Sequence, residues 1–152
     1  MRRNVFLKAG LAAAALVLVS GCATGIKHEQ MASGMPSLKS GEGRIYFFRS
    51  SSMVGAAVQP EIRLNGQVVG TSKPGGFFYL DRPAGNYVAA ASTETEKSVS
   101  FTLQPGETKY IRSSVNFGIV VGRVILEPET PDKAKAELNS LSYTGAPVAA
   151  SK

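Results

Sequence analysis

The run Ile62-Arg63-Leu64-Asn65-Gly66-Gln67-Val68-Val69-Gly70 decides the fold of this chain. With Glu61 before it, the first half of the run alternates charged and apolar residues, as does a strand with one buried face. Asn65-Gly66 then suits the two positive φ angles of a type I′ turn, and a second short strand follows. The run therefore predicts a tight β-hairpin over residues 61–70.

Short apolar runs of this kind recur from Gly43 to Leu126, and turn residues separate them about every eight to twelve positions. This spacing is typical of a β-sandwich or barrel. The other expected strands cover Arg44–Arg49, Phe77–Leu80, Asn86–Ser92, Ser98–Leu103, Lys109–Arg112, Ile119–Val121 and Val124–Leu126. The first of these is apolar on both faces, which indicates a strand covered on both sides. We expect one sandwich domain over residues 43–128.

The pattern changes after this domain. Thr130 can cap a helix, Pro131 suits its first position, and Ala134, Leu138 and Leu141 recur at helical spacing. We therefore expect one short helix over residues 129–143, laid on the sheet. A disordered tail is expected over residues 144–152.

The N-terminus has the three parts of a secretory signal peptide. Basic residues come first, an apolar stretch follows over residues 9–19, and Ser20-Gly21 precedes Cys22, the only cysteine. The apolar stretch is shorter than the roughly 20 residues that span a bilayer. We expect residues 1–21 to be removed after Sec export, with twin-arginine export, suggested by Arg2-Arg3, as the alternative.

The run Val19-Ser20-Gly21-Cys22 resembles the bacterial lipobox. The resemblance implies that the Cys22 thiol receives a diacylglycerol and that acyl chains such as palmitate tether the mature protein to a membrane. Ala23 follows where lipoproteins of the inner membrane usually carry Asp. In a cell with two membranes, the resemblance therefore implies the periplasmic face of the outer membrane. Membrane lipid is the first expected partner.

Residues 22–42 are expected to be a flexible, lipidated spacer, because small and polar residues dominate there without sustained periodicity. His28, the only histidine, falls in this spacer and is expected to be solvated. Three of the 17 basic residues lie in the signal, so 14 basic residues face 11 acidic ones in the mature chain, a net charge of +3. These charges are spread out, whereas nucleic-acid binding needs clustered basic residues. Acylation of Cys22 leaves no thiol for a disulfide.

Two further stretches of sequence, taken together with the hairpin, resemble a known domain. Phe78-Tyr79-Leu80 and Pro83-Ala84-Gly85-Asn86-Tyr87-Val88 look like the later parts of a PEGA-type surface domain. The stretch Gly43–Leu126, with the helix after it, resembles a bacterial lipoprotein family, domain of unknown function 2846. The resemblance implies a mainly β, prealbumin- or PEGA-like sandwich. The shared motifs are turn and core residues, so the resemblance implies no substrate.

Few residues can carry catalysis. His28 lies in the expected spacer, so no Ser–His pair is expected inside the domain. Close acidic pairs occur at Glu94/Glu96 and Glu127/Glu129, and glycoside hydrolases use two carboxylates about 5–10 Å apart. Both pairs, however, fall in turn-like contexts typical of solvated charges. We therefore expect no catalytic residue, no metal site and no cofactor.

Aromatic residues offer one further kind of site, a stacking platform for sugar rings. The candidates are Tyr46, Phe47, Phe48, Phe77, Phe78, Tyr79, Tyr87, Phe101, Tyr110 and Phe117. Adjacent residues on a strand point to opposite faces, so one of each Phe-Phe pair is expected in the core. The chain contains no Trp, which weakens the case for carbohydrate binding. Core packing is the better interpretation of this set.

Three classes of function remain. The leading hypothesis is a non-catalytic, lipid-anchored module of the cell envelope that binds or braces another envelope component, either a protein or the cell wall. The alternative is a module that binds peptidoglycan or another carbohydrate. An envelope hydrolase built on the Glu pairs is the remote alternative.

Overall fold

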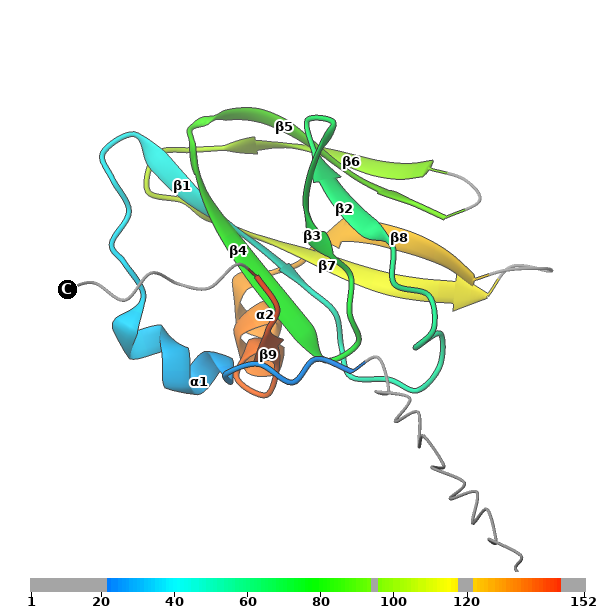
Figure 1. Cartoon of the computed structure of the whole chain (residues 1–152). Coiled ribbons are helices and arrows are strands. Elements are labelled where there is room, and N and C mark those ends of the chain that lie inside the picture. The colour runs from blue at the N-terminus through cyan, green and yellow to red at the C-terminus, as the bar shows by residue number, and fades with distance from the viewer. Residues whose placement is uncertain (1–21, 94–95, 118–121, 146–152) are drawn as a thin grey trace, which may run out of the picture.

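The computed structural model describes residues 22–93, 96–117 and 122–145, which form two β-sheets with helices on the outer face of one of them (Figure 1). The helical segments are α1 (His28–Met31), the 3₁₀ turn η1 (Ala32–Gly34) and α2 (Pro131–Leu138). The strands are β1 (Glu42–Phe48), β2 (Glu61–Leu64), β3 (Gln67–Thr71), β4 (Gly76–Pro83), β5 (Gly85–Ser92), β6 (Glu96–Leu103), β7 (Thr108–Phe117), β8 (Gly122–Pro128) and β9 (Ser142–Tyr143). The predicted mainly β fold with a short C-terminal helix is confirmed.

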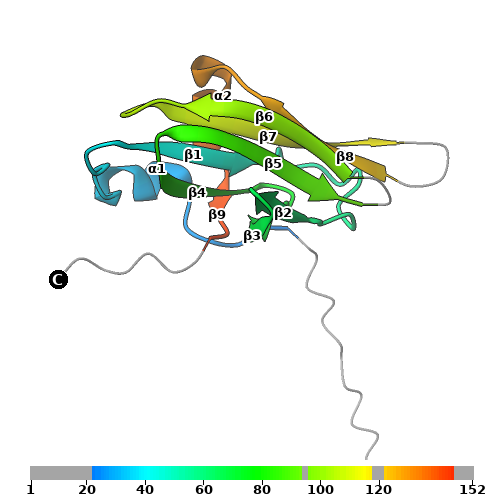
Figure 2. The ribbon, with the colours of Figure 1, turned by 90° about the horizontal axis from the view of Figure 1, so that it is seen from above.

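The sheets have five and four strands. The five-stranded sheet has the order β8-β7-β1-β4-β9, and the four-stranded sheet has the order β3-β2-β5-β6. β1 pairs antiparallel with β4 and parallel with β7, so the first strand lies at the centre of its sheet. Strands β5 and β6 lie over the five-stranded sheet (Figures 1 and 2). The β6 and β8 edges therefore come together on one side of the sandwich, where these two strands contact each other.

The predicted hairpin is confirmed as β2 and β3. Asn65 and Gly66 have φ angles of 48° and 81°, as a type I′ turn requires. The Asn65 side chain also accepts a hydrogen bond from the backbone N–H of Val88 on β5 (2.8 Å). The turn thus fixes both its own hairpin and the neighbouring strand.

The main core fills the space between the sheets. Phe47 and Phe78 stack there with ring centroids 5.1 Å apart. Its buried residues are Ile45, Phe47, Ile62, Leu64, Phe78, Ala89, Ala91, Leu103, Ile111, Val124 and Leu126. Burial of this apolar surface is the main favourable term in folding.

A second core covers the outer face of the five-stranded sheet. Its buried residues are Tyr46, Phe48, Phe77, Tyr110, Ala134, Leu138 and Leu141, and Met31 and Met35 pack against them. The neighbours Phe47 and Phe48 thus enter different cores, as do Phe77 and Phe78. This confirms that β1 is covered on both faces and that one residue of each Phe-Phe pair lies between the sheets.

Three of the expected segment boundaries need correction. The helix is shorter than residues 129–143, because the chain leaves α2 at Leu138 and adds β9 to the sheet edge beside β4. Thr144, expected in a disordered tail, donates its backbone N–H to the carbonyl of Phe77 (2.8 Å). The expectation of a flexible spacer over residues 22–42 is also wrong, because its first part is hydrogen-bonded to the sandwich. Residues 1–21, 94–95, 118–121 and 146–152, which include the signal and one expected strand, lie outside the described part of the chain.

Candidate functional site

The segment that follows Cys22 is docked on the sandwich, which contradicts the expected spacer over residues 22–42. The backbone N–H of Ala23 donates to the carbonyl of Pro74 (3.1 Å), in the loop between β3 and β4. Three residues on, the carbonyl of Ile26 accepts from the N–H of Tyr143 (2.8 Å). Residues 23–31, here called the N-terminal strap, therefore add backbone hydrogen bonds to the sheet edge that β9 forms.

The strap continues across the end of α2. His28 donates its backbone N–H to the carbonyl of Leu141 (3.0 Å), and the Lys27 ammonium donates to the carbonyl of Ser140 (2.7 Å). These partners are more than a hundred positions away in the sequence. The composition of the strap does not reveal these distant partners, and for this reason the sequence analysis predicted a spacer.

The docked strap places Cys22 on the surface of the domain, half-buried. The described chain begins near the β1–β2 loop (Figures 1 and 2), and the same loop lies against the end of β7, where Gly55 approaches Val115. We call these three features together the anchor end. A lipid on Cys22 would join the domain here directly, without an intervening flexible chain.

His28 is part of the second core, so the expectation of a solvated histidine is wrong. Its ring lies 5.2 Å from the ring of Phe77, and its Nε2 lies 3.4 Å from the Tyr46 hydroxyl. Burial lowers the pKa of His28 below its ordinary value of 6.5, against a smaller opposing effect of the Asn139 side chain. The neutral imidazole therefore packs the strap against the aromatic face.

The acidic pair Glu127/Glu129 does not form a catalytic dyad. Arg112 donates its Nε–H to the Glu129 carboxylate (3.0 Å), and the Thr130 backbone N–H donates to the same group (2.9 Å). Both bonds hold the pKa of Glu129 below its usual range, with the backbone bond the larger cause. Glu127 is exposed. Glu94 of the other candidate pair lies outside the described residues.

Arg112 organises a charged cluster that the sequence analysis missed. Besides Glu129, its guanidinium donates to the Glu137 carboxylate on α2 (2.9 Å) and to the Ser50 hydroxyl (3.0 Å). The same group lies 5.0 Å above the ring of Phe48. This cluster ties α2 to the sheet.

Arg44 is a second charged group that the sequence analysis missed. It forms a bidentate ion pair with Asp81 (2.7 and 2.8 Å) across β1 and β4, and it donates to the carbonyl of Pro36 (2.7 Å). Its guanidinium lies 4.6 Å from the ring centroid of Tyr79. In the sequence, Arg44 and Arg49 flank the apolar run of β1, and an arginine in such a position is a candidate for an ion pair or a contact with a neighbouring ring.

The aromatic face is largely covered. Tyr46 and Tyr110 stack with centroids 5.4 Å apart, and only 6% and 7% of their surfaces are exposed. Burial raises the pKa of Tyr46 to about 12, so its hydroxyl stays protonated at physiological pH. Tyr79 and Tyr143, with centroids 6.0 Å apart, remain half-buried. A sugar platform on this face would be limited to these two rings.

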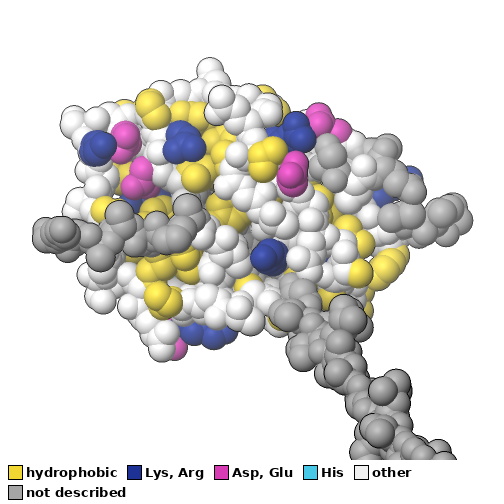
Figure 3. Space-filling view, viewed as in Figure 1, with side chains coloured by type: hydrophobic (Ala, Val, Ile, Leu, Met, Phe, Trp, Pro, Cys, Tyr) yellow, Lys and Arg dark blue, Asp and Glu magenta, His cyan; other side chains and the backbone are white. Residues whose placement is uncertain are grey.

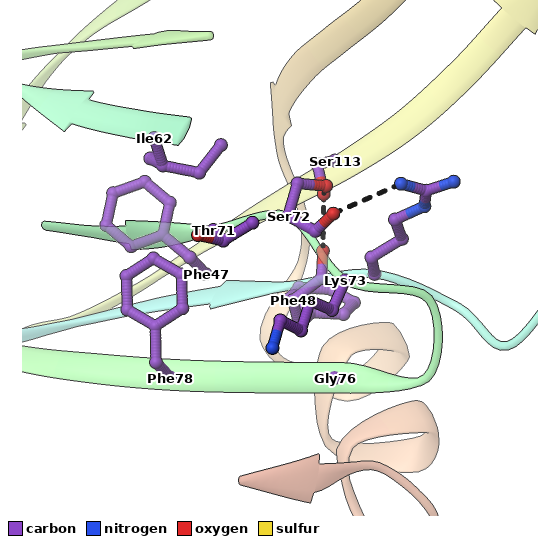
Figure 4. A pocket seen from close by; sticks show the side chains of 10 residues that line it. Phe47, Phe48, Ile62, Thr71, Ser72, Lys73, Gly76, Phe78 and Ser113 are labelled. Atoms are coloured by element: carbon purple, nitrogen blue, oxygen red, sulfur yellow. Dashed lines mark hydrogen bonds between the residues drawn. The ribbon is translucent and has the colours of Figure 1, made fainter. Parts of the chain in front are cut away.

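A small cavity lies between Phe47 and Phe78 on one side and Ser72 and Ser113 on the other (Figure 4). Its volume is about 10 Å³, enough for one water molecule. The two serine hydroxyls bond to each other (2.7 Å), and the buried Arg49 side chain donates to the Ser72 carbonyl (3.2 Å). Burial lowers the pKa of Arg49, which stays far above physiological pH. The cavity is a packing feature.

Two kinds of site are absent from the described part of the chain. It contains no group of His, Cys, Asp and Glu side chains that would hold a metal ion. Within the same residues, no helix is long and apolar enough to cross a bilayer.

Comparison with known proteins gives a family but no activity. An uncharacterized protein of Haemophilus influenzae is 26% identical over 145 residues, which cover 92% of this chain and 85% of that protein. No solved structure matches. The model of the family described as "Protein of unknown function (DUF2846)" matches residues 39–124, more than half of the chain. Because that match covers more than half of the residues, the chain belongs to the DUF2846 family.

Proposed function

We propose that this protein is a lipid-anchored lipoprotein of the cell envelope, and that its β-sandwich is a non-catalytic module that binds or braces another envelope component. The proposal places the lipid on Cys22 and, in a cell with two membranes, the domain on the periplasmic face of the outer membrane. The observation that carries it is the docked strap, which presents Cys22 on the surface of a folded domain.

The charged clusters support a structural module. Asp81 and Glu129 are engaged by arginines at 2.7–3.0 Å, and Glu137 by Arg112, and each pair joins two separate elements. These carboxylates therefore have a structural role that accounts for their placement. The same ion pairs weaken the hydrolase alternative, because Glu129 was one of its candidate groups.

A partner can be recognised through a sheet edge. β6 (Glu96–Leu103) closes one edge of the four-stranded sheet and packs against β8 of the other sheet, but the strand with which it is paired in the described part of the chain is β5. An edge strand offers backbone N–H and C=O groups to an extended segment of another protein. We propose an extended segment of an envelope protein as the partner at this edge.

The half-buried pair Tyr79/Tyr143 keeps the carbohydrate alternative open. Arg44 lies over the Tyr79 ring, but its guanidinium is already paired with Asp81, so a sugar would be recognised by stacking on the two rings. Binding of the purified domain to peptidoglycan sacculi, lost in Tyr79→Ala, would favour this alternative over the sheet edge.

The anchor is tested by metabolic labelling with palmitate. Wild-type protein should incorporate the label and enter the detergent phase, because the hydrophobic contribution of about 0.8 kcal/mol per buried CH₂ accumulates over several acyl chains. Cys22→Ala should carry no label and should stay uncut or be released. Label retained in Cys22→Ala would show that the lipid is elsewhere and would contradict the proposal.

The partner is tested by crosslinking in the native membrane. A photoreactive residue in place of Ser100 on β6 should capture an envelope protein, whereas the same residue in place of Glu29 on α1, at an exposed control position, should not. Equal capture from both positions would contradict recognition at the β6 edge.

A further inference from the structure

Exposed apolar side chains gather at the anchor end. Met53 is 81% exposed and Val54 is 58% exposed in the β1–β2 loop, and Phe117 is 68% exposed at the end of β7. Hydrophobic side chains are visible on this side of the space-filling view (Figure 3). Exposure of large apolar side chains to water is unfavourable, so their concentration here points to a partner.

The side chain of Arg49 holds the β1–β2 loop in place. Arg49 donates to the carbonyls of Gly55 (2.8 Å) and Val58 (2.6 Å), the residues that follow the exposed pair. Gly55 lies so close to β7 that an added Cβ would come within 2.7 Å of the Val115 side chain. Val115 and Phe117 are two positions apart on β7 and share a face. The loop and the end of β7 therefore form one continuous surface.

The strap links this surface to the lipidation site. Ala23 is bonded to Pro74, and the next residue, Gly75, lies against the β1–β2 loop with its N–H donating to the carbonyl of Ser50 (3.3 Å). The distance from Cys22 to the loop is thus bridged by a short path of backbone hydrogen bonds. The lipidation site and the start of the β1–β2 loop are therefore neighbours on the surface of the domain.

Exposed basic side chains lie close in sequence to residues that touch the β1–β2 loop. Lys73 is two positions before Gly75, which lies near Ser51, and Arg123 directly follows Gly122, which lies near Val58. Arg123 is paired with Asn116, on the face of the β7–β8 hairpin opposite to Val115 and Phe117. Lysine and arginine beside apolar side chains are typical of a protein surface that sits on anionic lipid headgroups.

We propose that Met53, Val54 and Phe117 form a membrane-contact surface that enters the headgroup region of the bilayer holding the Cys22 lipid. This inference rests on the proposed function, because it takes the acylated Cys22 as the first point of attachment. The occupant of the surface is the lipid bilayer itself, with anionic headgroups beside Lys73 and Arg123. The domain is therefore held in one orientation, rather than hanging from a flexible spacer.

The chain contains no Trp, so a single introduced Trp reports its own surroundings. Met53→Trp and Phe117→Trp test the surface. Val68→Trp and Val88→Trp are matched controls, because Val68 and Val88 are also exposed apolar residues, at 52% and 43%, but lie on the outer face of the four-stranded sheet. Each acylated variant is reconstituted into phosphatidylethanolamine–phosphatidylglycerol vesicles that contain brominated acyl chains.

Trp at 53 and 117 should show blue-shifted emission and lose most of its fluorescence to the brominated chains, whereas Trp at 68 and 88 should keep both. Unchanged emission at positions 53 and 117, in protein whose N-terminal peptide carries the acyl mass, would overturn this inference alone. Equal quenching at all four positions would also overturn it. An N-terminal peptide without the acyl mass would overturn the proposed function and this inference together.

Discussion

Single residues set the geometry of the strands and of the strap. At the β2–β3 turn, Asn65 and Gly66 both adopt positive φ, and the Asn65 side chain reaches β5. At the strap, His28 lies between Tyr46 and Asn139, and its burial favours the neutral ring. The two sites differ in kind, since one depends on backbone conformation and the other on protonation.

Gly66→Val tests the backbone requirement. An added Cβ at Gly66 meets nothing within 4 Å, so the cost comes from the φ of +81° alone, which a β-branched residue resists. We expect a loss of about 1–3 kcal/mol in the free energy of unfolding, measured by urea denaturation. Gly34→Val is the control, because Gly34 has equally open surroundings and no positive φ. Equal losses in the two variants would contradict a strained turn.

The lowered pKa of His28 predicts a pH-dependent strap. The docked histidine has a pKa below 6.5, so below that pH the undocked form binds more protons than the docked form. Docking is therefore stable above pH 6.5 and weakens as the pH falls. Exchange of the Ala23 and His28 amides, which donate to Pro74 and Leu141, should reveal this change after correction for intrinsic rates.

His28→Gln is the control for this prediction. Glutamine retains a polar side chain of similar length but does not titrate, so the exchange of the strap amides should lose its additional pH dependence. The same dependence in wild type and variant would show that another group is responsible.

At the scale of elements, local pattern predicts some contacts and misses others. The Asn65-Gly66 hairpin is encoded by turn chemistry, and α2 by Pro131 at its start and by apolar spacing within about a dozen residues, so both are predictable. Thr130 precedes the helix as expected, but its side chain makes no capping hydrogen bond. The strap and β9 are not, because Ile26 and His28 find their partners at Tyr143 and Leu141. A two-residue strand has no periodicity, and a strap with few apolar residues has none either. Their structure depends on the edge that the finished sheet offers.

The attachment of α2 depends on charge as well as on packing. Arg112→Gln removes donors from Glu129, Glu137 and Ser50 together, and we expect a loss on the order of 1–3 kcal/mol in the free energy of unfolding. Arg63→Gln is the matched control, because Arg63 pairs with Glu61 at the surface, where both side chains are largely exposed. That change should stay within about 0.5 kcal/mol. Similar denaturation midpoints for the two variants would contradict a structural role of the Arg112 cluster.

For the whole molecule, the docked strap changes what a lipid on Cys22 would do. A flexible spacer would let the domain move away from the membrane, whereas the docked strap would keep the anchor end close to the bilayer. The outer face of the four-stranded sheet, with Val68 and Val88, is then left to the aqueous side. The exposed charge of Glu127 was predictable, but the ion pair of Glu129 with Arg112 was not, because it joins residues 17 positions apart. The meaning of Cys22 for orientation was not predictable either, because it depends on the bond between Ala23 and Pro74.

Insertion of a sixteen-residue Gly-Ser linker between Thr24 and Gly25 distinguishes attachment to the membrane through the lipid from the position of the domain against the bilayer. The variant keeps Cys22 and its neighbours for acylation, and it leaves His28 free to dock, but it adds a flexible reach of roughly 20–24 Å. We expect the linker variant to stay in the detergent phase like wild type. In the Phe117→Trp background it should lose most of the quenching by brominated lipid, because the end of β7 no longer has to lie at the bilayer. Quenching that survives the linker unchanged would mean that Phe117 and its neighbours bind the membrane by themselves, and that the strap does not set the orientation of the domain.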